Sequence, residues 1–173
     1  MIRHNWTTNP DRRESDADHT WNLCMMILLL ENDVKDKLDV LKSMKIALVH
    51  DLVEIYAGDE FHFTKNKELT KVEEEKAAKK LRAKLPQDLG DEVYSLWHEF
   101  EEMKTPEAKL VQALDKLDPV LQDLSVQAKT HKEFKLNFET VFNDKIAHLE
   151  ANKENKLLIE IYKQVLDEFK KMI

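Results

Sequence analysis

The sequence contains very little glycine, proline or cysteine, and each shortage excludes a class of structure. Two glycines and four prolines in 173 residues leave few positions for the tight turns that connect short antiparallel strands. A single cysteine excludes an internal disulfide, and chains without disulfides are typical of the cytosol. The composition therefore predicts an all-α protein with a cytoplasmic location.

An excess of basic charge and a long apolar run are also missing. The chain has 27 basic and 34 acidic residues and a formal net charge of -7, so we expect no basic surface for a nucleic acid polymer. The apolar run LCMMILLL is too short to cross a bilayer. The N-terminal segment lacks the apolar core of a signal peptide. We therefore expect no membrane partner.

The length of the chain and its 42% of hydrophobic residues suit a single domain over residues 1–173. We expect residues 1–17 to form an irregular lead-in. Apolar periodicity then predicts a series of helices, one of them over residues 36–56, with residues 130–173 completing a helical bundle. The first helix begins near Asp18, and its expected buried face consists of Trp21, Cys24, Met25, Leu28 and Leu29.

Charged residues interrupt the apolar segment LVHDLVEIYAGDE. Unpaired polar groups are costly in such surroundings, so we expect His50 and Asp51 to hold a partner. On a helix, His50 and Glu54 lie one turn apart, and Asp51 lies about 100° round from His50. The pattern is not H-E-x-x-H, because position 54 is a glutamate. By itself, a His-Asp pair is more typical of a solvated or capped helix.

Two residues on other predicted helices favour a metal site. His19 stands at the start of the first helix, and Asp115 stands beside the inward stripe of the helix AKLVQALDKLDPVLQDL. Together with His50 and Asp51 they form a mixed nitrogen and oxygen set, which suits Mn, Fe, Co, Ni or Zn better than Ca or Mg. Asp118 is a rival for the role of Asp115, which would otherwise be an exposed carboxylate paired with a neighbouring lysine.

The order H…HD…D resembles the signature of the HD-domain metal-dependent phosphohydrolases. ESDADHTW is similar to the ES-x-x-(E/D)-H opening of one branch, ALVHDLVEIYAGD to its core motif, and KLVQALDKLD to its last ligand helix. That branch is the single-domain 5'-deoxynucleotidases, which include HD domain-containing protein 2. The resemblance extends from about Arg3 to Asp123. It implies an HD-type bundle of about six to eight helices, a homodimer, and hydrolysis of (deoxy)nucleoside 5'-monophosphates to nucleoside and phosphate.

The resemblance also implies a role for individual residues. One divalent metal would be bound by His19, His50, Asp51 and Asp115. Glu54 would orient or deprotonate the attacking water, and Asp59 would help to protonate the leaving oxygen. An arginine and a tryptophan would contact phosphate and sugar, and the candidates are Arg3, Trp6, Arg12 and Arg13. Trp6 is equally typical of a residue that packs the N-terminus onto the core.

Other interpretations stay open. The chain could hydrolyse a different phosphorylated molecule, such as a cyclic or alarmone nucleotide, or serve as a non-catalytic binding module. His62 and His98 lie between the HD pair and the last aspartate, where a second metal would find its ligands, although we expect one metal. His131 and His148 lie in polar helical segments and should be solvated.

Overall fold

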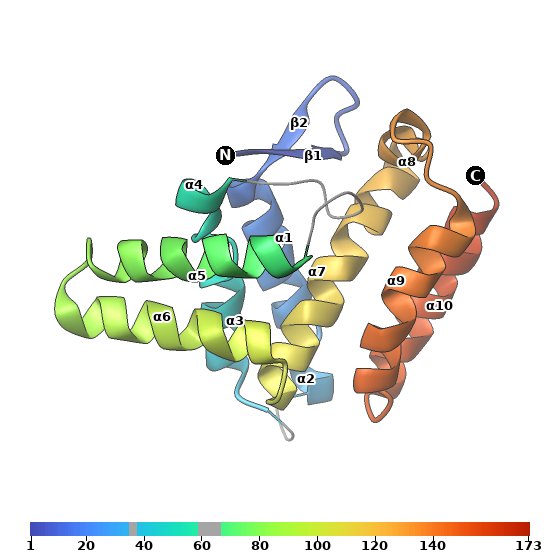
Figure 1. Ribbon diagram of the computed structural model, residues 1–173. Coiled ribbons are helices and arrows are strands. Elements are labelled where there is room, and N and C mark those ends of the chain that lie inside the picture. Colours follow the sequence, from blue (N-terminus) through green and yellow to red (C-terminus); the bar gives the residue numbers. More distant parts are fainter. Residues whose placement is uncertain (35–37, 59–66) are drawn as a thin grey trace.

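Helix α7 (Pro106–Ser125) runs through the middle of the molecule, and most of the other long helices pack against it (Figure 1). The computed structural model describes residues 1–34, 38–58 and 67–173. Its elements are β1 (Ile2–Trp6), β2 (Arg13–Ser15), α1 (Asp16–Leu29), α2 (Glu31–Val34), α3 (Val40–Val49), α4 (Glu54–Ala57), α5 (Lys67–Arg82), α6 (Gln87–Glu102), α7 (Pro106–Ser125), α8 (Lys129–Glu133), α9 (Phe138–Ala151) and α10 (Lys156–Lys170). The prediction of an all-α fold is confirmed. No helix in the described ranges combines the length and apolar character needed to span a membrane.

The start of helix α7 is specified by two adjacent residues. The side chain of Thr105 accepts a hydrogen bond from the backbone N–H of Ala108, and Pro106 occupies the first turn, as is common at helix starts. Its leucines at positions 110, 114 and 117 are almost completely buried in the main core. This core is shared with α1, α3, α9 and α10, so α7 is the element against which the others are positioned.

Helix α1 buries a different face from the predicted one. Its cap is Ser15, which forms a capping box with Asp18, and its buried residues are His19, Leu23 and Ile27. Three of the residues expected inside are instead exposed: Trp21 at 64%, Leu28 at 46% and Leu29 at 75%. The segment is apolar on nearly every side, so its periodicity did not define which face turns inward.

The N-terminal lead-in is not irregular, so that prediction is wrong. Strands β1 and β2 form a two-stranded antiparallel sheet. The backbone N–H of Trp6 donates to the hydroxyl of Thr130, which precedes His131 in α8. The hairpin is therefore held by a contact 124 residues away in sequence, which no local pattern reveals.

The second predicted helix is divided in two. Helix α3 ends at Val49, residues 50–53 form a turn, and α4 begins at Glu54. The turn places Val53 in a smaller core with Ala77, Ala78 and Trp97 of α5 and α6. Gly58 then ends α4 with a φ of 86°, a conformation that glycine adopts without strain.

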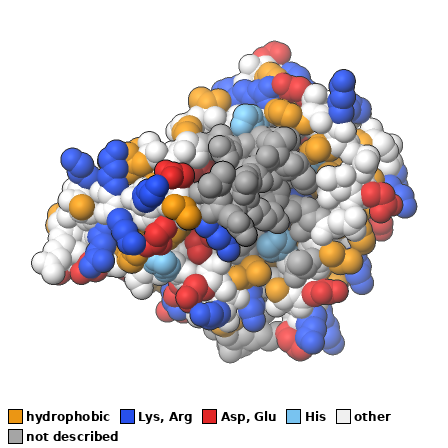
Figure 2. Space-filling model, viewed as in Figure 1, with side chains coloured by type: hydrophobic (Ala, Val, Ile, Leu, Met, Phe, Trp, Pro, Cys, Tyr) orange, Lys and Arg blue, Asp and Glu red, His pale blue; other side chains and the backbone are white. Residues whose placement is uncertain are grey.

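Helices α5 and α6 form an arm at one side of the molecule (Figure 1). A Cβ atom on Gly90 would lie 2.5 Å from the carbonyl oxygen of Arg82, so the glycine allows the two helices to approach. The outer face of the arm carries interspersed basic and acidic side chains (Figure 2), among them the pairs Lys76–Glu73 and Lys79–Glu75. These pairs give α5 a charged outer face.

Candidate metal centre

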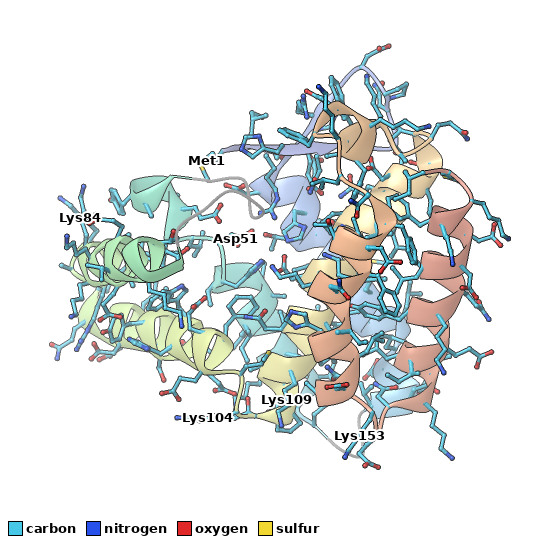
Figure 3. All side chains as sticks on the ribbon, turned by 45° about the vertical axis from the view of Figure 1, so that its right-hand side comes forward. Met1, Asp51, Lys84, Lys104, Lys109 and Lys153 are labelled. Atoms are coloured by element: carbon cyan, nitrogen blue, oxygen red, sulfur yellow. The ribbon has the colours of Figure 1, made fainter. Side chains whose placement is uncertain are left out.

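The four predicted metal ligands lie together where α1, α7 and the end of α3 meet. Nε2 of His19 is 3.1 Å from Oδ1 of Asp115 and 3.8 Å from Oδ2 of Asp51. Nε2 of His50 is 3.1 Å from Oδ1 of Asp51 and 3.8 Å from Oδ1 of Asp115. Figure 3 shows Asp51 within the molecule, between the hairpin and the helices below it. The described side chains therefore bring two imidazoles and two carboxylates to one point.

The orientation of His50 leaves one ring nitrogen available. Nδ1 lies 2.8 Å from the backbone carbonyl oxygen of Ala47, which can only accept, so Nδ1 carries the proton in the neutral ring. Nε2 is buried and has no hydrogen-bond partner in the described structure. A buried lone pair that faces carboxylates is the arrangement expected of a metal ligand.

The electrostatics of the cluster also favour a cation. Burial opposes ionisation of Asp51 and Asp115, but neighbouring cationic groups hold the pKa of both carboxyls below the usual value. Burial and Arg3 oppose protonation of His19, yet hydrogen bonds to Asp115 and Asp118 raise its pKa to about 10. Anionic carboxylates and imidazole nitrogen are ligands for divalent transition metals, so the residues present fit such an ion.

Asp115 and Asp118 occupy different positions relative to His19. Asp115 is only 8% exposed, so it is not the exposed carboxylate of the alternative interpretation, although Lys116 does pair with it at 2.9 Å. Asp118 lies on the other edge of the imidazole, where Oδ2 is 2.8 Å from Nδ1. Asp115, not Asp118, therefore faces the same side of the ring as His50 and Asp51.

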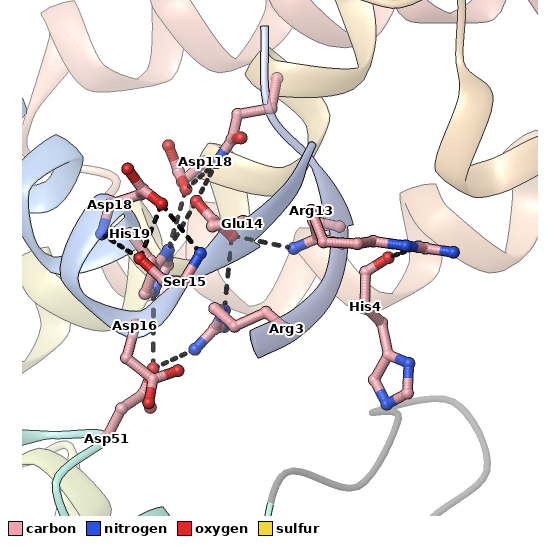
Figure 4. A network of polar contacts seen from close by, with 12 residues as sticks. Arg3, His4, Arg13, Glu14, Ser15, Asp16, Asp18, His19, Asp51 and Asp118 are labelled. Atoms are coloured by element: carbon pink, nitrogen blue, oxygen red, sulfur yellow. Dashed lines mark hydrogen bonds and ion pairs between the residues drawn. The ribbon is translucent and has the colours of Figure 1, made fainter. Parts of the chain in front are cut away.

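A second row of buried polar residues lies behind the cluster, and most of it was not foreseen from the sequence (Figure 4). Glu14 is fully buried and accepts a hydrogen bond from Gln122. Burial and the nearby carboxylate of Asp118 raise the pKa of Glu14 to about 7. A signal did exist for part of this row. Asp118 and Gln122 follow Asp115 at i+3 and i+7, which is one face of a helix.

The candidate arginines have separate environments. Arg3 contacts the carboxylate of Asp51, and its Nε lies 3.4 Å from Glu14. Burial opposes the charge on Arg3, but Asp51, Asp115, Glu14 and Glu54 together raise its pKa. Arg12 is instead bound to Asp18 in the capping box of α1. Arg13 contacts Glu133 of α8 at 2.5 Å. Of the three arginines, the structure thus brings Arg3 beside the metal ligands.

Trp6 lies at the contact between the hairpin and α8. Its indole N–H donates to Glu133 at 2.8 Å. The cationic groups of Arg13 and Lys129 lie over its ring, 4.0 and 3.4 Å from the centroid. These contacts are those of a residue that fastens the N-terminus, and the proposed contact of Trp6 with a sugar stays a prediction.

Of the two predicted proton-handling residues, the structure describes one. Glu54 is the first residue of α4 and is partly buried. It is close enough to Arg3 to raise the pKa of the guanidinium, so it borders the cluster. Asp59 and the candidate ligand His62 lie outside the described residues.

The remaining histidines lie away from the cluster. His98 on α6 is half exposed, 3.1 Å from Glu75. His131 was expected to be solvated, and this is wrong: it is 5% exposed, and its Nδ1 bonds to the carboxylate of Asp123. The sequence does not show that Asp123 turns inward to meet it. His148 is partly buried.

Fold and cluster together define an all-helical protein with a buried candidate centre for one divalent metal. A sequence model described as HD domain matches residues 1–156. The chain belongs to the HD domain family.

Named relatives and a solved structure agree with this assignment. The chain is 34% identical over 129 residues to 5'-deoxynucleotidase HDDC2 of Homo sapiens, a match that covers 74% of this chain and 62% of that relative. The protein of the same name from Dictyostelium discoideum is 35% identical over 141 residues, which is 75% of this chain and 72% of the relative. The match thus spans less than two thirds of the human relative.

The fold is similar to that of a predicted metal-dependent phosphohydrolase from Magnetospirillum magnetotacticum. The TM-score is 0.88 and the sequence identity is 30%, with 99% of this chain and 87% of that chain covered.

Proposed function

We propose that this protein is a metal-dependent phosphomonoesterase that hydrolyses (deoxy)nucleoside 5'-monophosphates to nucleoside and phosphate. The observation that carries the proposal is the buried Nε2 of His50, which has no hydrogen-bond partner among the described residues and faces the carboxylates of the adjacent Asp51 and of Asp115 on α7. The names of the relatives support the substrate class, and the HD domain family supports hydrolytic chemistry at this centre.

The metal would be held by His19, His50, Asp51 and Asp115. A divalent transition metal bound there lowers the pKa of a bound water towards ~7 and neutralises phosphate charge. The donor set suits Mn, Co, Fe, Ni or Zn.

Glu54 borders the cluster and would orient the attacking water or take its proton. Asp59 would donate a proton to the departing 5' oxygen. Arg3, beside Asp51, is the favoured phosphate contact because its guanidinium can form paired hydrogen bonds with phosphate oxygens. Trp6, Arg12 and Arg13 are less favoured, since their partners are Glu133 and Asp18 and not the predicted metal ligands.

Phosphate release from a substrate panel tests the proposal. Purified protein with Mn²⁺, Co²⁺ or Mg²⁺ should release phosphate from nucleoside 5'-monophosphates in preference to cyclic or alarmone nucleotides. Glu54→Gln should keep the metal and lose about 10²–10⁴-fold in kcat, the usual contribution of a general base. Absence of release from every monophosphate would contradict the proposal, and a fully active Glu54→Gln would contradict the role of Glu54.

We also infer that the protein is a homodimer located in the cytoplasm. The single cysteine supports the location. The dimer is supported by an exposed apolar surface on two packed helices, and such surfaces often mark interfaces. We call this surface the α1–α3 face, and its residues are Trp21, Leu28, Leu29, Leu41 and Leu48.

Sedimentation measurements test the dimer. Leu29→Glu should give a monomer, because it puts a charge in the α1–α3 face. Val72→Glu, at an exposed apolar position on α5, is the matched control and should remain dimeric. A monomeric wild-type protein would contradict this inference.

A further inference from the structure

The two nitrogens of His19 face different surroundings, and only one side belongs to the predicted ligand cluster. Nε2 is directed towards Asp115 and Asp51. Nδ1 lies 2.8 Å from Oδ2 of Asp118, and both residues are buried. A neutral imidazole that binds a metal through one nitrogen carries its proton on the other. If Nε2 serves the metal, Nδ1–H is therefore the donor to Asp118.

Asp118 is itself held in place by Gln122, one turn further along α7. The side-chain amide of Gln122 donates to Oδ2 of Asp118 at 2.8 Å and also donates to Oε1 of Glu14. It thus joins two buried carboxylates that would otherwise repel each other. Oε1 of Glu14 is 3.9 Å from Nδ1 of His19, beyond hydrogen-bond distance. Asp118, rather than Glu14, is the acceptor of the ring proton (Figure 4).

The same residues could in principle surround a second ion, because donor atoms of Glu14, His19 and Asp118 lie within 4.8 Å of one another. Two contacts oppose that use. Gln122 already directs hydrogen-bond donors at both carboxylates. Nε of Arg3 lies 3.4 Å from Oε2 of Glu14 and supplies positive charge there. The arrangement is that of a hydrogen-bonded support rather than a second metal site.

We propose that Asp118 is a positioning residue of the metal centre: it accepts the Nδ1 proton of His19 and thereby presents Nε2 to the metal, while Gln122 fixes the Asp118 carboxylate. This rests on the proposed function to the extent that His19 is a metal ligand. Carboxylates that orient histidine ligands typically contribute about 10–100-fold to metal affinity. The chain thus uses the hairpin residue Glu14, through Gln122, to steady a ligand on α1.

Zinc affinity of the full-length protein, measured by competition with a chelator, tests the proposal. Asp118→Asn should bind Zn²⁺ about 10–100-fold more weakly than wild type, and Asp118→Glu should recover part of the loss. Asp123→Asn is the matched control, since Asp123 is a buried aspartate on the same helix, α7, that pairs with a different histidine, His131 of α8. It should keep wild-type affinity. Wild-type affinity in a folded Asp118→Asn, or two zinc ions per wild-type chain, would overturn the proposal.

A second readout separates positioning from general stability. In the zinc-loaded protein, ¹⁵N NMR should detect a proton on Nδ1 of His19, and its signal should shift or disappear in Asp118→Asn but not in Asp123→Asn. An unchanged signal would overturn the proposal. If Asp118→Asn does not fold, Gln122→Met provides a second test, because it keeps Asp118 but removes the hydrogen bond that fixes its carboxylate. Weaker zinc binding is again expected, and unchanged binding would overturn the proposal.

The zinc measurements are independent of substrate. A wild type that binds zinc through a protonated Nδ1 but releases no phosphate would refute the proposed function and leave the role of Asp118 supported. An active wild-type enzyme whose Asp118→Asn variant binds zinc with wild-type affinity would support the proposed function and refute the role of Asp118.

Discussion

Helix α7 supplies the acidic partner of two buried histidines, and the two pairs differ in what surrounds the rest of each ring. Asp118 bonds to His19 from α1, and Asp123 bonds to His131 from α8. The second nitrogen of His19 faces the carboxylates of two predicted ligands. Nε2 of His19 thus points to the place where the second imidazole and the two carboxylates of the predicted ligand set meet, and the first pair is open to a further cation.

The pair of His131 and Asp123 is closed, in the sense that other groups of the protein surround both the carboxylate and the ring. The carboxylate of Asp123 also accepts the backbone N–H groups of Thr130 and His131, both at 3.0 Å. The ring of His131 packs edge-on against Phe169 at 4.5 Å between centroids. A buried His-Asp pair is therefore not in itself a metal site, and the feature that sets His19 apart is a second nitrogen that faces the carboxylates of two predicted ligands.

Removing each histidine in turn should give the largest contrast. His19→Ala deletes a predicted ligand, so metal affinity should fall by more than the ~100-fold that loss of an outer partner produces, and phosphate release should stop. His131→Ala should keep the wild-type metal affinity and turnover per folded molecule. Metal content after dialysis checks both variants. Equal metal content in the two would remove the distinction between the pairs.

The closed pair should matter for stability instead. Asp123→Asn leaves buried donors with a poorer acceptor, which should lower the free energy of unfolding by about 1–3 kcal/mol. Urea unfolding of the zinc-loaded protein provides the measurement, with wild type as reference. An Asp123→Asn variant as stable as wild type but depleted of zinc would show that the assignment of the two pairs is reversed.

The two pairs should also respond to opposite ends of the pH range. The pKa of His19 in the metal-free protein is raised from 6.5 to about 10, so its stabilising contribution is complete below pH 6.5 and is lost as the pH rises towards 10. For Asp123, burial opposes ionisation, but hydrogen bonds from His131 and Thr130 hold its pKa below the usual 3.8. That contribution is present above pH 3.8 and is lost as the pH falls further.

Urea titrations of chelator-treated protein at a series of pH values check this pattern. Zinc-loaded protein should lose less stability on the alkaline side, because the metal takes the place of the Nε2 proton. Metal-free protein with constant stability from pH 6.5 to 10 would contradict the account of His19.

The sequence predicts best where the signal is a local motif or the order of such motifs along the chain. Thr105 and Pro106 specify the start of α7 through capping and a fixed φ. The H…HD…D order identified four residues that the fold does bring together. Gly58 likewise ends α4 by a local cause, the positive φ that glycine adopts without strain.

The predictions from sequence that were wrong, and the residues that were missed, depend on tertiary contacts. No glycine or proline marks the turn after Val49 in the sequence. The turn depends instead on Val53, which packs against α5 and α6. The inward turn of His131 depends on Asp123. The second row around Glu14 forms where a strand, an α1 residue and α7 meet at one point. Helical periodicity describes the faces of single helices and does not predict such a contact.

The three tryptophans stand in three separate environments, and this gives the unlabelled protein a set of optical probes. Trp97 is 4% exposed in the smaller core, which includes Val53 of the turn that precedes Glu54. Trp21 is exposed on the α1–α3 face, and Trp6 lies beneath two cations where the hairpin meets α8. Fluorescence of variants that keep one tryptophan each would therefore follow loading of the candidate metal centre, self-association and hairpin detachment as three independent signals.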